Sequence, residues 1–351
     1  MDTQQRREIL TEIPGRYSRQ VLFSGIGSEG QAKIITSKVV LVGCGALGSV
    51  QASLLTRAGV GFLRIIDRDF VEENNLQRQI LFDEEDARAI LPKAIAAQNK
   101  LRAANSWVSI EGMVEDLTAS NIEKLAGGFD LILDATDNFD VRFLLNDFAV
   151  KSGTAWIYGA CVGSYGITFP ILPGETACLR CIIEDPPAPG FSPSCETAGI
   201  IGPIASIIAS FQASEALKIL SGQKSLVNRR ITSFDLWSNQ RDAVNLPAPH
   251  PQCPCCGLHD FPYLDGKMGT EAAALCGRNS VQIRRNDGSH FNLEDVARKL
   301  PSSCILKISN FLLRASIDNY ELTVFPDGRA IISGTDSLAV AKSLYARYIG
   351  I

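Results

Sequence analysis

The sequence feature that most constrains the fold is a glycine run that separates a β-rich apolar stretch from a helical one. Residues 38–42 (KVVLV) are followed by Gly43, Gly45 and Gly48 in a G-x-G-x-x-G pattern. Glycines in this context let backbone amides and a helix N-terminus cradle phosphate groups. Asp67 follows Gly48 by 19 residues, at the end of the next apolar stretch, where a carboxylate can accept hydrogen bonds from both ribose hydroxyls. The pattern therefore predicts a βαβ nucleotide-binding unit.

Alternating apolar and helical segments extend this unit. A helical pattern over 87–105 precedes a predicted strand over 106–114, and residues 129–138 have the composition of a buried parallel strand that ends in polar residues. Alternation of this kind predicts a doubly wound sheet that binds its ligand at the carboxyl ends of the strands.

The pattern changes after residue 151. Glycine-rich, strand-like sequence gives way to a proline-rich loop over 185–199 and then to an apolar core helix over 200–222. We expect an α/β fold: a Rossmann-like doubly wound sheet that continues into a mixed or antiparallel half, plus a small C-terminal α+β domain. The expected divisions are 1–30 (N-terminal arm), 31–150 (nucleotide-binding half), 151–268 (second half, with paired cysteines and a crossover loop) and 270–351 (the α+β domain).

The loop after Asp67 carries side chains that a dinucleotide site does not need. Gln77 and Arg78 follow in DRDFVEENNLQRQ, and Lys93 lies in the next helical segment. Arg78 as a planar fork and Lys93 as a point charge can neutralise the charge that builds up on phosphate oxygens during transfer, which favours a triphosphate. The alternatives are a structural salt bridge for Arg78, a solvated helix lysine for Lys93, and an NAD-dependent dehydrogenase for the whole fingerprint.

A second polar group follows the predicted strand of residues 129–134. Asp137 and Asn138 lie where a hard oxygen ligand would meet a Mg²⁺ ion that bridges phosphates. The alternative interpretation is that the pair caps the following helix.

Four of the ten cysteines form two C-x-x-C pairs. Cys178 with Cys181 and Cys253 with Cys256 match the pattern of a closed, tetrahedral, structural Zn²⁺ site with four thiolate ligands. Cys255 lies inside the second pair and could replace a neighbour, although the spacing favours Cys256. Reduced thiols or a redox pair remain the alternatives, but neither pair opens a thioredoxin-like helix.

These motifs together resemble the MoeB/ThiF/HesA family, the bacterial relatives of ubiquitin-activating enzymes. The resemblance covers about residues 14–260 and rests on RYSRQ, the glycine pattern, Asp67, NLQRQ, the lysine of LPKAIAA, ATDN, the paired C-x-x-C motifs and ETAGIIGP. One departure is Ala46, where many members have a further glycine. The family uses ATP to adenylate the C-terminal Gly-Gly carboxylate of a small ubiquitin-fold sulfur-carrier protein and releases pyrophosphate.

The resemblance implies a role for each matched residue. Residues 151–268 would be the carrier-binding half, Asp137 would help to hold Mg²⁺, and Arg19 of RYSRQ would reach the ATP of a neighbouring subunit in a homodimer. The expected catalytic residues are Arg19, Arg78, Lys93, Asp137 and Cys195. The expected cofactor-binding residues are Gly43, Gly45, Ala46, Gly48, Asp67, Asp69, Asn74, Asn75, Gln77, Arg78, Lys93, Asp137 and Asn138.

Cys195 lies in the proline-rich loop just before the apolar helix. A helix N-terminus lowers the pKa of a thiol, which makes a thiolate available at neutral pH. The resemblance implies that this residue accepts the activated carrier as a thioester or acyl disulfide. The alternative is a loop cysteine without a function, with another protein delivering the sulfur. A cysteine desulfurase or a rhodanese is therefore an expected further partner, in thiamine or molybdenum-cofactor biosynthesis.

The resemblance also leaves other acceptors open. The same fold adenylates a peptide C-terminus in antibiotic maturation and a tRNA base in related dehydratases. Residues 270–351 are compatible with a ubiquitin-like or partner-docking domain or with a stabilising appendage, but not with a rhodanese active loop. A net charge of −4 disfavours nucleic acid as the main partner, and the sequence has no apolar leader or spanning segment, so we expect a cytoplasmic enzyme without a membrane partner.

Overall fold

The computed structural model describes residues 15–187, 195–268, 272–275, 279–283, 291–301 and 304–349. The chain divides into two compact units, Met1–Pro186 with Ile200–Met268, and Pro187–Gly199 with Gly269–Ile351. Each unit has its own sheet, and each is described by itself. None of the described helices combines the length and the apolar character needed to cross a bilayer.

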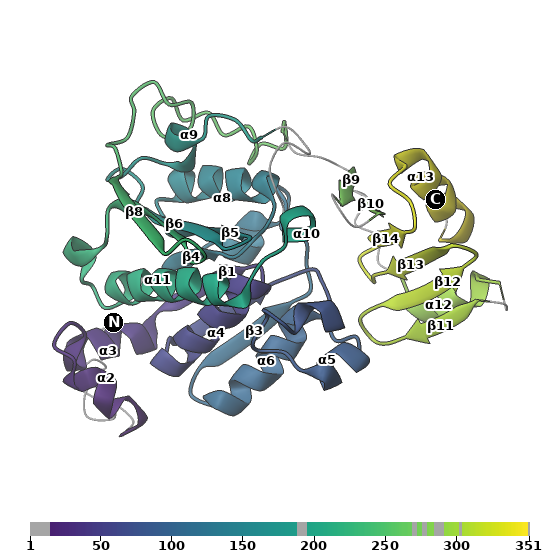
Figure 1. Ribbon diagram of the computed structural model, residues 1–351, viewed down its shortest axis with the longest axis horizontal. Coiled ribbons are helices and arrows are strands. Elements are labelled where there is room, and N and C mark those ends of the chain that lie inside the picture. Colours follow the sequence, from purple (N-terminus) through teal and green to yellow (C-terminus); the bar gives the residue numbers. More distant parts are fainter. Residues whose placement is uncertain are drawn as a thin grey trace. The chain divides into compact units, whose positions relative to one another are not determined.

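The first unit is built on an eight-stranded sheet of order β3-β2-β1-β4-β5-β6-β7-β8 (Figure 1). Strands β3 to β5 pair in parallel, and β5 to β8 pair antiparallel, so the doubly wound half continues into an antiparallel half as expected. The strands are β1 (Lys38–Val42), β2 (Phe62–Ile66), β3 (Ser109–Met113), β4 (Leu131–Asp134), β5 (Ala155–Val162), β6 (Tyr165–Ile171), β7 (Arg230–Asp235) and β8 (Gln240–Asn245).

Helices cover both faces of this sheet. Residues of α3, α4, α6 and α11 pack on one face, and residues of α7 and α8 pack on the other together with the paired cysteines. The helices of the unit are α2 (Ser18–Leu22), α3 (Gly27–Thr36), α4 (Ala46–Ala58), α5 (Glu84–Arg88), α6 (Lys93–Ala104), α7 (Ile122–Ala126), α8 (Phe139–Ser152), α9 (Leu179–Ile182) and α11 (Gly202–Leu220), with short 3₁₀ turns at Gly15–Tyr17, Glu73–Asn75 and Lys224–Leu226.

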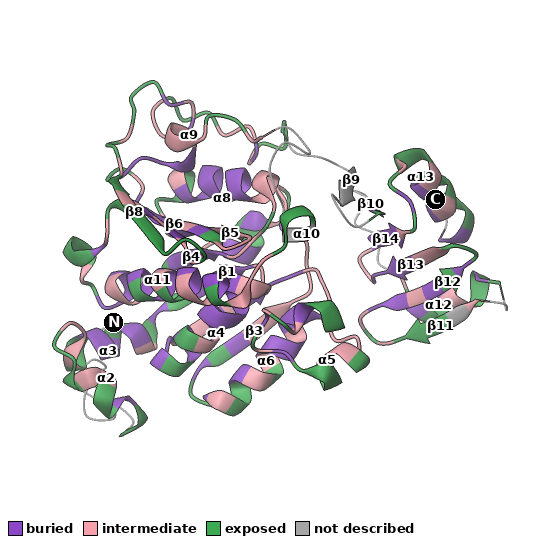
Figure 2. Cartoon of the chain, in the orientation of Figure 1, coloured by how far each residue is buried: buried purple, intermediate pink, exposed green. Residues whose placement is uncertain are grey.

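The continuous apolar sequence of β1 reflects burial on both faces. Val39 and Leu41 pack with the helices α3, α4, α6 and α11, whereas Val40 and Val42 pack with α7 and α8. Figure 2 shows the buried residues concentrated along these central strands and on the inner sides of the helices. A parallel strand covered on both sides needs such an unbroken apolar run, because successive side chains point to opposite faces.

Two segments differ from the sequence predictions: one predicted helix is divided, and one predicted loop contains a short helix. The predicted helix over 87–105 is two helices, α5 and α6, because Pro92 disfavours a helical conformation at Leu91 and Ile90 has a positive φ of 50°. Cys195 does not begin the long apolar helix: it begins the separate four-residue α10 (Cys195–Ala198), and α11 starts at Gly202, with Pro203 in its first turn.

The second unit contains a six-stranded sheet of order β11-β12-β13-β14-β10-β9, with every described pair antiparallel. Its core lies between the sheet and two helices. The Asp327-Gly328 turn joins β13 to β14, with Gly328 at φ 78° and the Asp327 carboxylate accepting the Arg329 amide at 3.1 Å. The elements are β9 (Ala272–Leu275), β10 (Ser280–Ile283), α12 (Leu293–Lys299), β11 (Ile305–Ile308), β12 (Leu313–Ile317), β13 (Tyr320–Val324), β14 (Ala330–Ser333) and α13 (Leu338–Tyr348).

Candidate functional site

The glycine loop lies where the strand order reverses, between β1 and β4. Gly43 has a φ of 90°, and a Cβ on it would be 2.6 Å from the Ala135 carbonyl oxygen after β4. A Cβ on Gly48 would be only 2.2 Å from the Gly43 carbonyl oxygen. The two positions therefore accept only glycine, and helix α4 begins at Ala46 directly against the loop. In open α/β sheets this reversal is the place where ligands bind.

Asp67 directly follows β2, beside the glycine loop. One carboxylate oxygen accepts the Cys44 amide at 2.5 Å, and the other accepts the Asp69 amide at 2.7 Å. Burial raises the pKa of the Asp67 carboxyl, and the nearby Lys93 ammonium opposes that increase. Backbone amides thus hold this carboxylate at the rim of the loop, which is the position that a ribose ligand requires.

Lys93 is the first residue of α6, and its side chain is 7% exposed. Its ammonium lies 3.3 Å from the Asp69 carboxylate, and its amide donates to the Asp69 carbonyl oxygen at 2.9 Å. Arg68 pairs with Asp116 at 3.2 Å and with Asp69 at 3.8 Å. The residues after β2 therefore form a network of carboxylates and cations whose geometry depends on the buried lysine.

The loop that contains Asn74, Asn75, Gln77 and Arg78 lies close to the glycine loop and to the start of α11. Asn75 is buried, Gln77 is exposed, and the Arg78 guanidinium donates to the Asn74 carbonyl oxygen at 2.7 Å. A Cβ on Gly202 would be 3.0 Å from the Gln77 carbonyl oxygen, and a Cβ on Gly45 would be 3.8 Å from the side-chain nitrogen of Gln79. The loop thus brings its polar side chains to the same edge of the sheet as the glycines.

Asp137 and Asn138 follow β4 and have different roles in the structure. Asn138 is the N-cap of α8, because its side-chain oxygen accepts the Asp140 amide at 2.8 Å. Asp137 is exposed. Burial lowers the pKa of both Arg68 and Arg142, whereas the negative charges around them raise it, and Asp137 is one of the smaller of these charges in each case. The carboxylate of Asp137 therefore remains available at the edge where the glycine loop lies.

A buried ion pair behind Asp137 had no counterpart in the sequence predictions. Asp134, the last residue of β4, lies 3.3 Å from the guanidinium of Arg142 in the first turn of α8. Both side chains are buried. Neither residue belongs to a motif of fixed spacing, and the only sequence signal was a charged residue on each side of the ATDN segment.

The structure does not bring Arg19 to the glycine loop of its own chain. Arg19 lies in α2, two residues after Tyr17, whose ring packs against Gly59 at the end of α4. The glycine loop is at the other end of α4, and a helix of this length spans about 20 Å. Cys195 begins α10, but its side chain lies outside the described residues.

Cys178, Cys181, Cys253 and Cys256 come together as a group of four sulfur atoms, all within 4.8 Å of one another. The sulfur of Cys178 lies 3.9 Å from that of Cys181 and 3.6 Å from that of Cys253, and the sulfurs of Cys181 and Cys256 are 3.4 Å apart. Zn–S bonds of about 2.3 Å in a tetrahedron place the sulfurs about 3.8 Å apart. The four residues therefore fit a tetrahedral metal ion, with Cys256 in the group and Cys255 outside it.

Helix α8 supports both cysteine pairs through residues that no motif indicated. Asn146 is fully buried: its side-chain oxygen accepts the Leu179 amide at 2.7 Å, and its side-chain nitrogen donates to the Cys255 sulfur at 3.2 Å. The neighbouring Asp147 carboxylate accepts the Tyr263 amide at 3.0 Å. One helix turn thus fixes the segments that carry the first and the second C-x-x-C pair.

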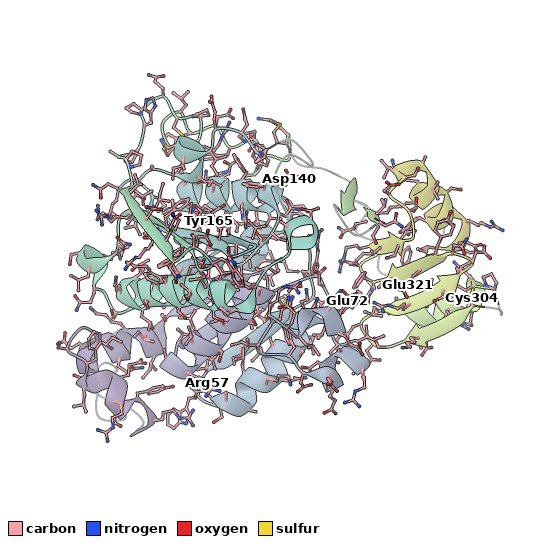
Figure 3. All side chains as sticks on the ribbon, viewed as in Figure 1. Arg57, Glu72, Asp140, Tyr165, Cys304 and Glu321 are labelled. Carbon is pink, nitrogen blue, oxygen red and sulfur yellow. The ribbon has the colours of Figure 1, made fainter. Side chains whose placement is uncertain are left out.

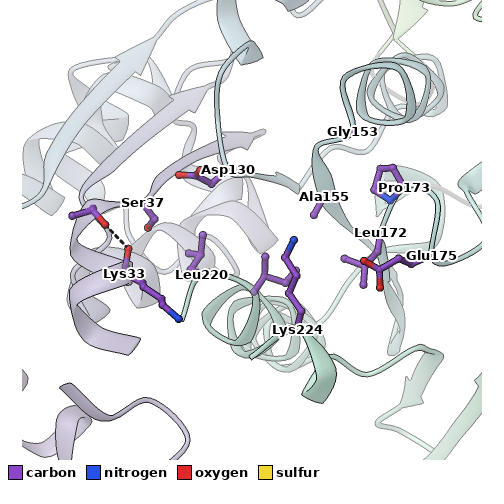
Figure 4. A pocket seen from close by; sticks show the side chains of 12 residues that line it. Lys33, Ser37, Asp130, Gly153, Ala155, Leu172, Pro173, Glu175, Leu220 and Lys224 are labelled. Atoms are coloured by element: carbon purple, nitrogen blue, oxygen red, sulfur yellow. Dashed lines mark hydrogen bonds between the residues drawn. The ribbon is translucent and has the colours of Figure 1, made fainter. Parts of the chain in front are cut away.

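A cavity of about 390 Å³ lies at the opposite edge of the sheet, where the parallel strands begin (Figure 4). It is open and polar, and Lys33 and Lys224 lie at its rim among exposed side chains. The residues around it are Lys33, Thr36, Ser37, Asp130, Gly153, Ala155, Leu172, Pro173, Glu175, Ile219, Leu220 and Lys224. It contains none of the candidate nucleotide residues, so it is separate from the site built around the glycine loop.

Comparisons with known proteins agree with this geometry. The sequence model of the ThiF family matches residues 17–255. The chain is 46% identical over 340 residues to the sulfur carrier protein ThiS adenylyltransferase of Bacillus subtilis, which covers 96% of this chain and 100% of that protein. It is 35% identical to the SAMP-activating enzyme E1 of Haloferax volcanii, over 71% of this chain and 93% of that protein.

Solved structures show the same fold. Escherichia coli MccB, in a structure with ATP, superimposes with a TM-score of 0.61 at 24% identity, over 70% of this chain and 75% of that one.

Proposed function

Because the chain belongs to the ThiF family, we propose that it is an ATP-dependent adenylyltransferase acting on a ubiquitin-like sulfur-carrier protein. Its substrate would be the C-terminal Gly-Gly carboxylate of the carrier. The observation that carries this proposal is the meeting of the glycine loop, Asp67 and the buried Lys93 at the reversal of strand order. The extensive similarity to a ThiS adenylyltransferase favours thiamine biosynthesis, with molybdenum-cofactor biosynthesis as the alternative.

The reaction needs few groups from the protein. A carboxylate oxygen of the carrier forms a bond to the α-phosphorus of ATP, the bond from that phosphorus to the bridging oxygen breaks, and pyrophosphate leaves with the electron pair. An ionised carboxylate is already a nucleophile, so no general base is required. Lys93 and Arg78 would stabilise the charge that develops on the phosphate oxygens, and Asp67 would hold the ribose. Asp137 would supply a hard oxygen ligand for Mg²⁺, which would neutralise phosphate charge when bound.

The four-cysteine group would hold Zn²⁺ as a structural ion, because four thiolates leave no open position for chemistry. Arg19 would act on the nucleotide of a second subunit, since α2 lies a helix length away from the glycine loop of its own chain. The Cys195 thiolate would displace AMP from the acyl-adenylate of the carrier to form a thioester. After a cysteine desulfurase or rhodanese has transferred a sulfane sulfur to Cys195, its persulfide would displace AMP to form an acyl disulfide. The domain boundaries expected at residues 30, 150 and 268 remain predictions.

Carrier-dependent exchange of labelled pyrophosphate into ATP tests the proposed reaction. Exchange should appear only when a small protein ending in Gly-Gly is present. Exchange with a peptide or a tRNA, but with no such carrier, would favour the alternative acceptors. Binding of NADH without any affinity for ATP would favour an oxidoreductase and contradict the proposal.

The open face of the antiparallel half is the proposed docking surface for the carrier. Helix α11 packs against Phe234 on one face. The strand register places Tyr165, labelled in Figure 3, and Val244 on the opposite face, where they are 43% and 63% exposed. Strand β8 is the last strand in the order of this sheet. A compact ubiquitin-fold protein can cover this mixed polar and apolar face while its extended C-terminus reaches the glycine loop.

Replacement of Val244 with aspartate should raise the KM for the carrier by about tenfold or more, because a charge would be buried in the interface. The KM for ATP should stay unchanged. The matched control is Leu226→Asp, which places the same charge on an equally exposed apolar residue of the turn Lys224–Leu226. Equal effects of both substitutions on the carrier KM would contradict the proposed docking face.

A further inference from the structure

The segment from β4 to α8 is closed by hydrogen bonds between Asp134, Thr136 and Arg142, to which the sequence analysis assigned no role; only Thr136 belongs to a motif, ATDN. One carboxylate oxygen of Asp134 accepts both the Thr136 amide at 2.9 Å and the Thr136 hydroxyl at 2.7 Å. The Arg142 guanidinium lies 3.3 Å from the second oxygen and donates to the Thr136 carbonyl oxygen at 2.5 Å. It also donates to the Gly159 carbonyl oxygen on β5 at 3.3 Å. Thr136, the residue before Asp137, is thus held through its amide, its hydroxyl and its carbonyl group.

The surroundings of Arg142 add to this restraint. Its guanidinium lies 5.2 Å from the ring centroid of Phe139 and 5.0 Å from that of Tyr158. Asn138 holds the C-terminal side of Asp137, because its side chain caps α8 at Asp140. Asp137 is therefore an exposed carboxylate between two anchored neighbours. An ion pair as buried as Asp134 and Arg142 is weak evidence for a purely stabilising role, since apolar residues often replace such a pair at no loss of stability.

We propose that Asp134, Thr136 and Arg142 are positioning residues that hold the Asp137 carboxylate in the geometry that binds the magnesium ion of magnesium·ATP. This inference rests on the proposed function. A Mg²⁺ ion requires nearly ideal octahedral geometry, so a ligand that moves by a fraction of an ångström binds it less well. Two guanidinium groups, of Arg68 and Arg142, also balance the charge of Asp137 from the protein side. Asp134, Thr136 and Arg142 act through Asp137 and do not contact the substrate.

Thr136→Val is the main test, because valine keeps the shape of threonine and removes only the hydroxyl that binds Asp134. The Mg²⁺ concentration for half-maximal pyrophosphate exchange should rise about tenfold, in the range found when partners that orient a metal ligand are removed. The KM for the carrier should not change. Thr136→Ser keeps the hydroxyl and should restore the wild-type Mg²⁺ dependence.

The matched control is Thr176→Val at the opposite edge of the sheet. The Thr176 hydroxyl is buried, accepts the Leu172 amide at 2.9 Å and lines no part of the nucleotide site. Thr176→Val should lower the melting temperature at least as much as Thr136→Val does, and it should leave the Mg²⁺ dependence unchanged. If both variants shift the Mg²⁺ dependence equally, or if neither does, the positioning role is wrong.

Arg142→Lys provides a second test that keeps the positive charge and removes the planar fork that binds both Asp134 and Thr136. It should raise the Mg²⁺ requirement more than Thr136→Val does, with Mn²⁺ restoring part of the activity because that ion tolerates less regular coordination. A variant that binds Mg²⁺·ATP as wild type does would overturn the inference. Failure of the wild-type protein itself to bind ATP or to exchange pyrophosphate would instead overturn the proposed function.

Discussion

Replacing Lys93 with methionine should lower the rate of carrier-dependent pyrophosphate exchange by about 10²- to 10³-fold. Methionine retains most of the length and apolar volume of the side chain but removes the ammonium group. A preorganised charge at a developing phosphate charge typically contributes a factor of this size. The structure places the ammonium in a largely buried position beside Asp69, so it needs little rearrangement when ATP binds. The effect should fall mainly on kcat, because the charge on the phosphate oxygens is largest in the transition state.

Lys100→Met is the matched control for this prediction. Lys100 lies on the same helix, α6, and pairs with Asp83 and Asp86 in a more exposed environment. Its removal should cost little, as is usual for surface ion pairs. If Lys93→Met retained more than about a tenth of the exchange rate at the same melting temperature, Lys93 would not be the phosphate-stabilising cation, and Arg78 would have to supply that charge.

The nucleotide loop could be predicted because its signal is local. Gly43 and Gly48 have contacts that exclude any side chain, and these contacts occur between residues close in sequence or at the ends of adjacent strands. Lys93 was predicted as a candidate from its charge in the helical segment after Asp67 and from the LPKAIAA motif, and in the structure it is the first residue of α6, after the N-cap Pro92. By contrast, the pairing of Asp134 with Arg142 depends on the angle between a strand and the following helix, which a sequence pattern does not specify.

The support of the cysteine group shows the same limit more clearly. The C-x-x-C spacing predicted four ligands, and the structure places the four sulfurs together. Asn146, however, contacts Leu179, 33 residues away, and Cys255, 109 residues away. Its sequence neighbours belong to an ordinary buried helix and form no motif, so only the tertiary structure shows that the helix after Asp137 also supports both cysteine pairs. A single helix, α8, thus connects the loop of the nucleotide site with the cysteine group.

The position of Cys195 shows what composition alone missed. The apolar run over 200–222 predicted the long helix to within two residues, because α11 spans Gly202–Leu220. The proline-rich loop predicted before it, however, contains a short helix. Residues Cys195–Ala198, which precede α11, form the separate short helix α10. The proposed thioester role of Cys195 therefore cannot draw on the dipole of the long helix, and it depends on the chemistry of the carrier and of the sulfur donor.

Substitution of Cys256 with serine should release the metal ion and destabilise the first unit, whereas Cys255→Ser should retain the metal. The wild-type protein should contain about one zinc ion per chain by inductively coupled plasma mass spectrometry. Binding of a structural zinc ion contributes to folding directly, so a loss of about 5 kcal/mol would lower the melting temperature by about 10 to 20 °C. Cys255 is the appropriate control because it is adjacent and buried but lies outside the group of four sulfurs.

Removal of the metal from the wild-type protein separates a structural role of the metal from a catalytic one. Slow removal of zinc from the wild-type protein by a chelator should lower the melting temperature before it lowers the exchange rate per folded molecule, because no residue of the nucleotide site is a ligand of the metal. A metal-free protein that remained as stable as the loaded one would refute the structural role. Loss of zinc from Cys255→Ser, with retention in Cys256→Ser, would instead assign the fourth ligand to Cys255.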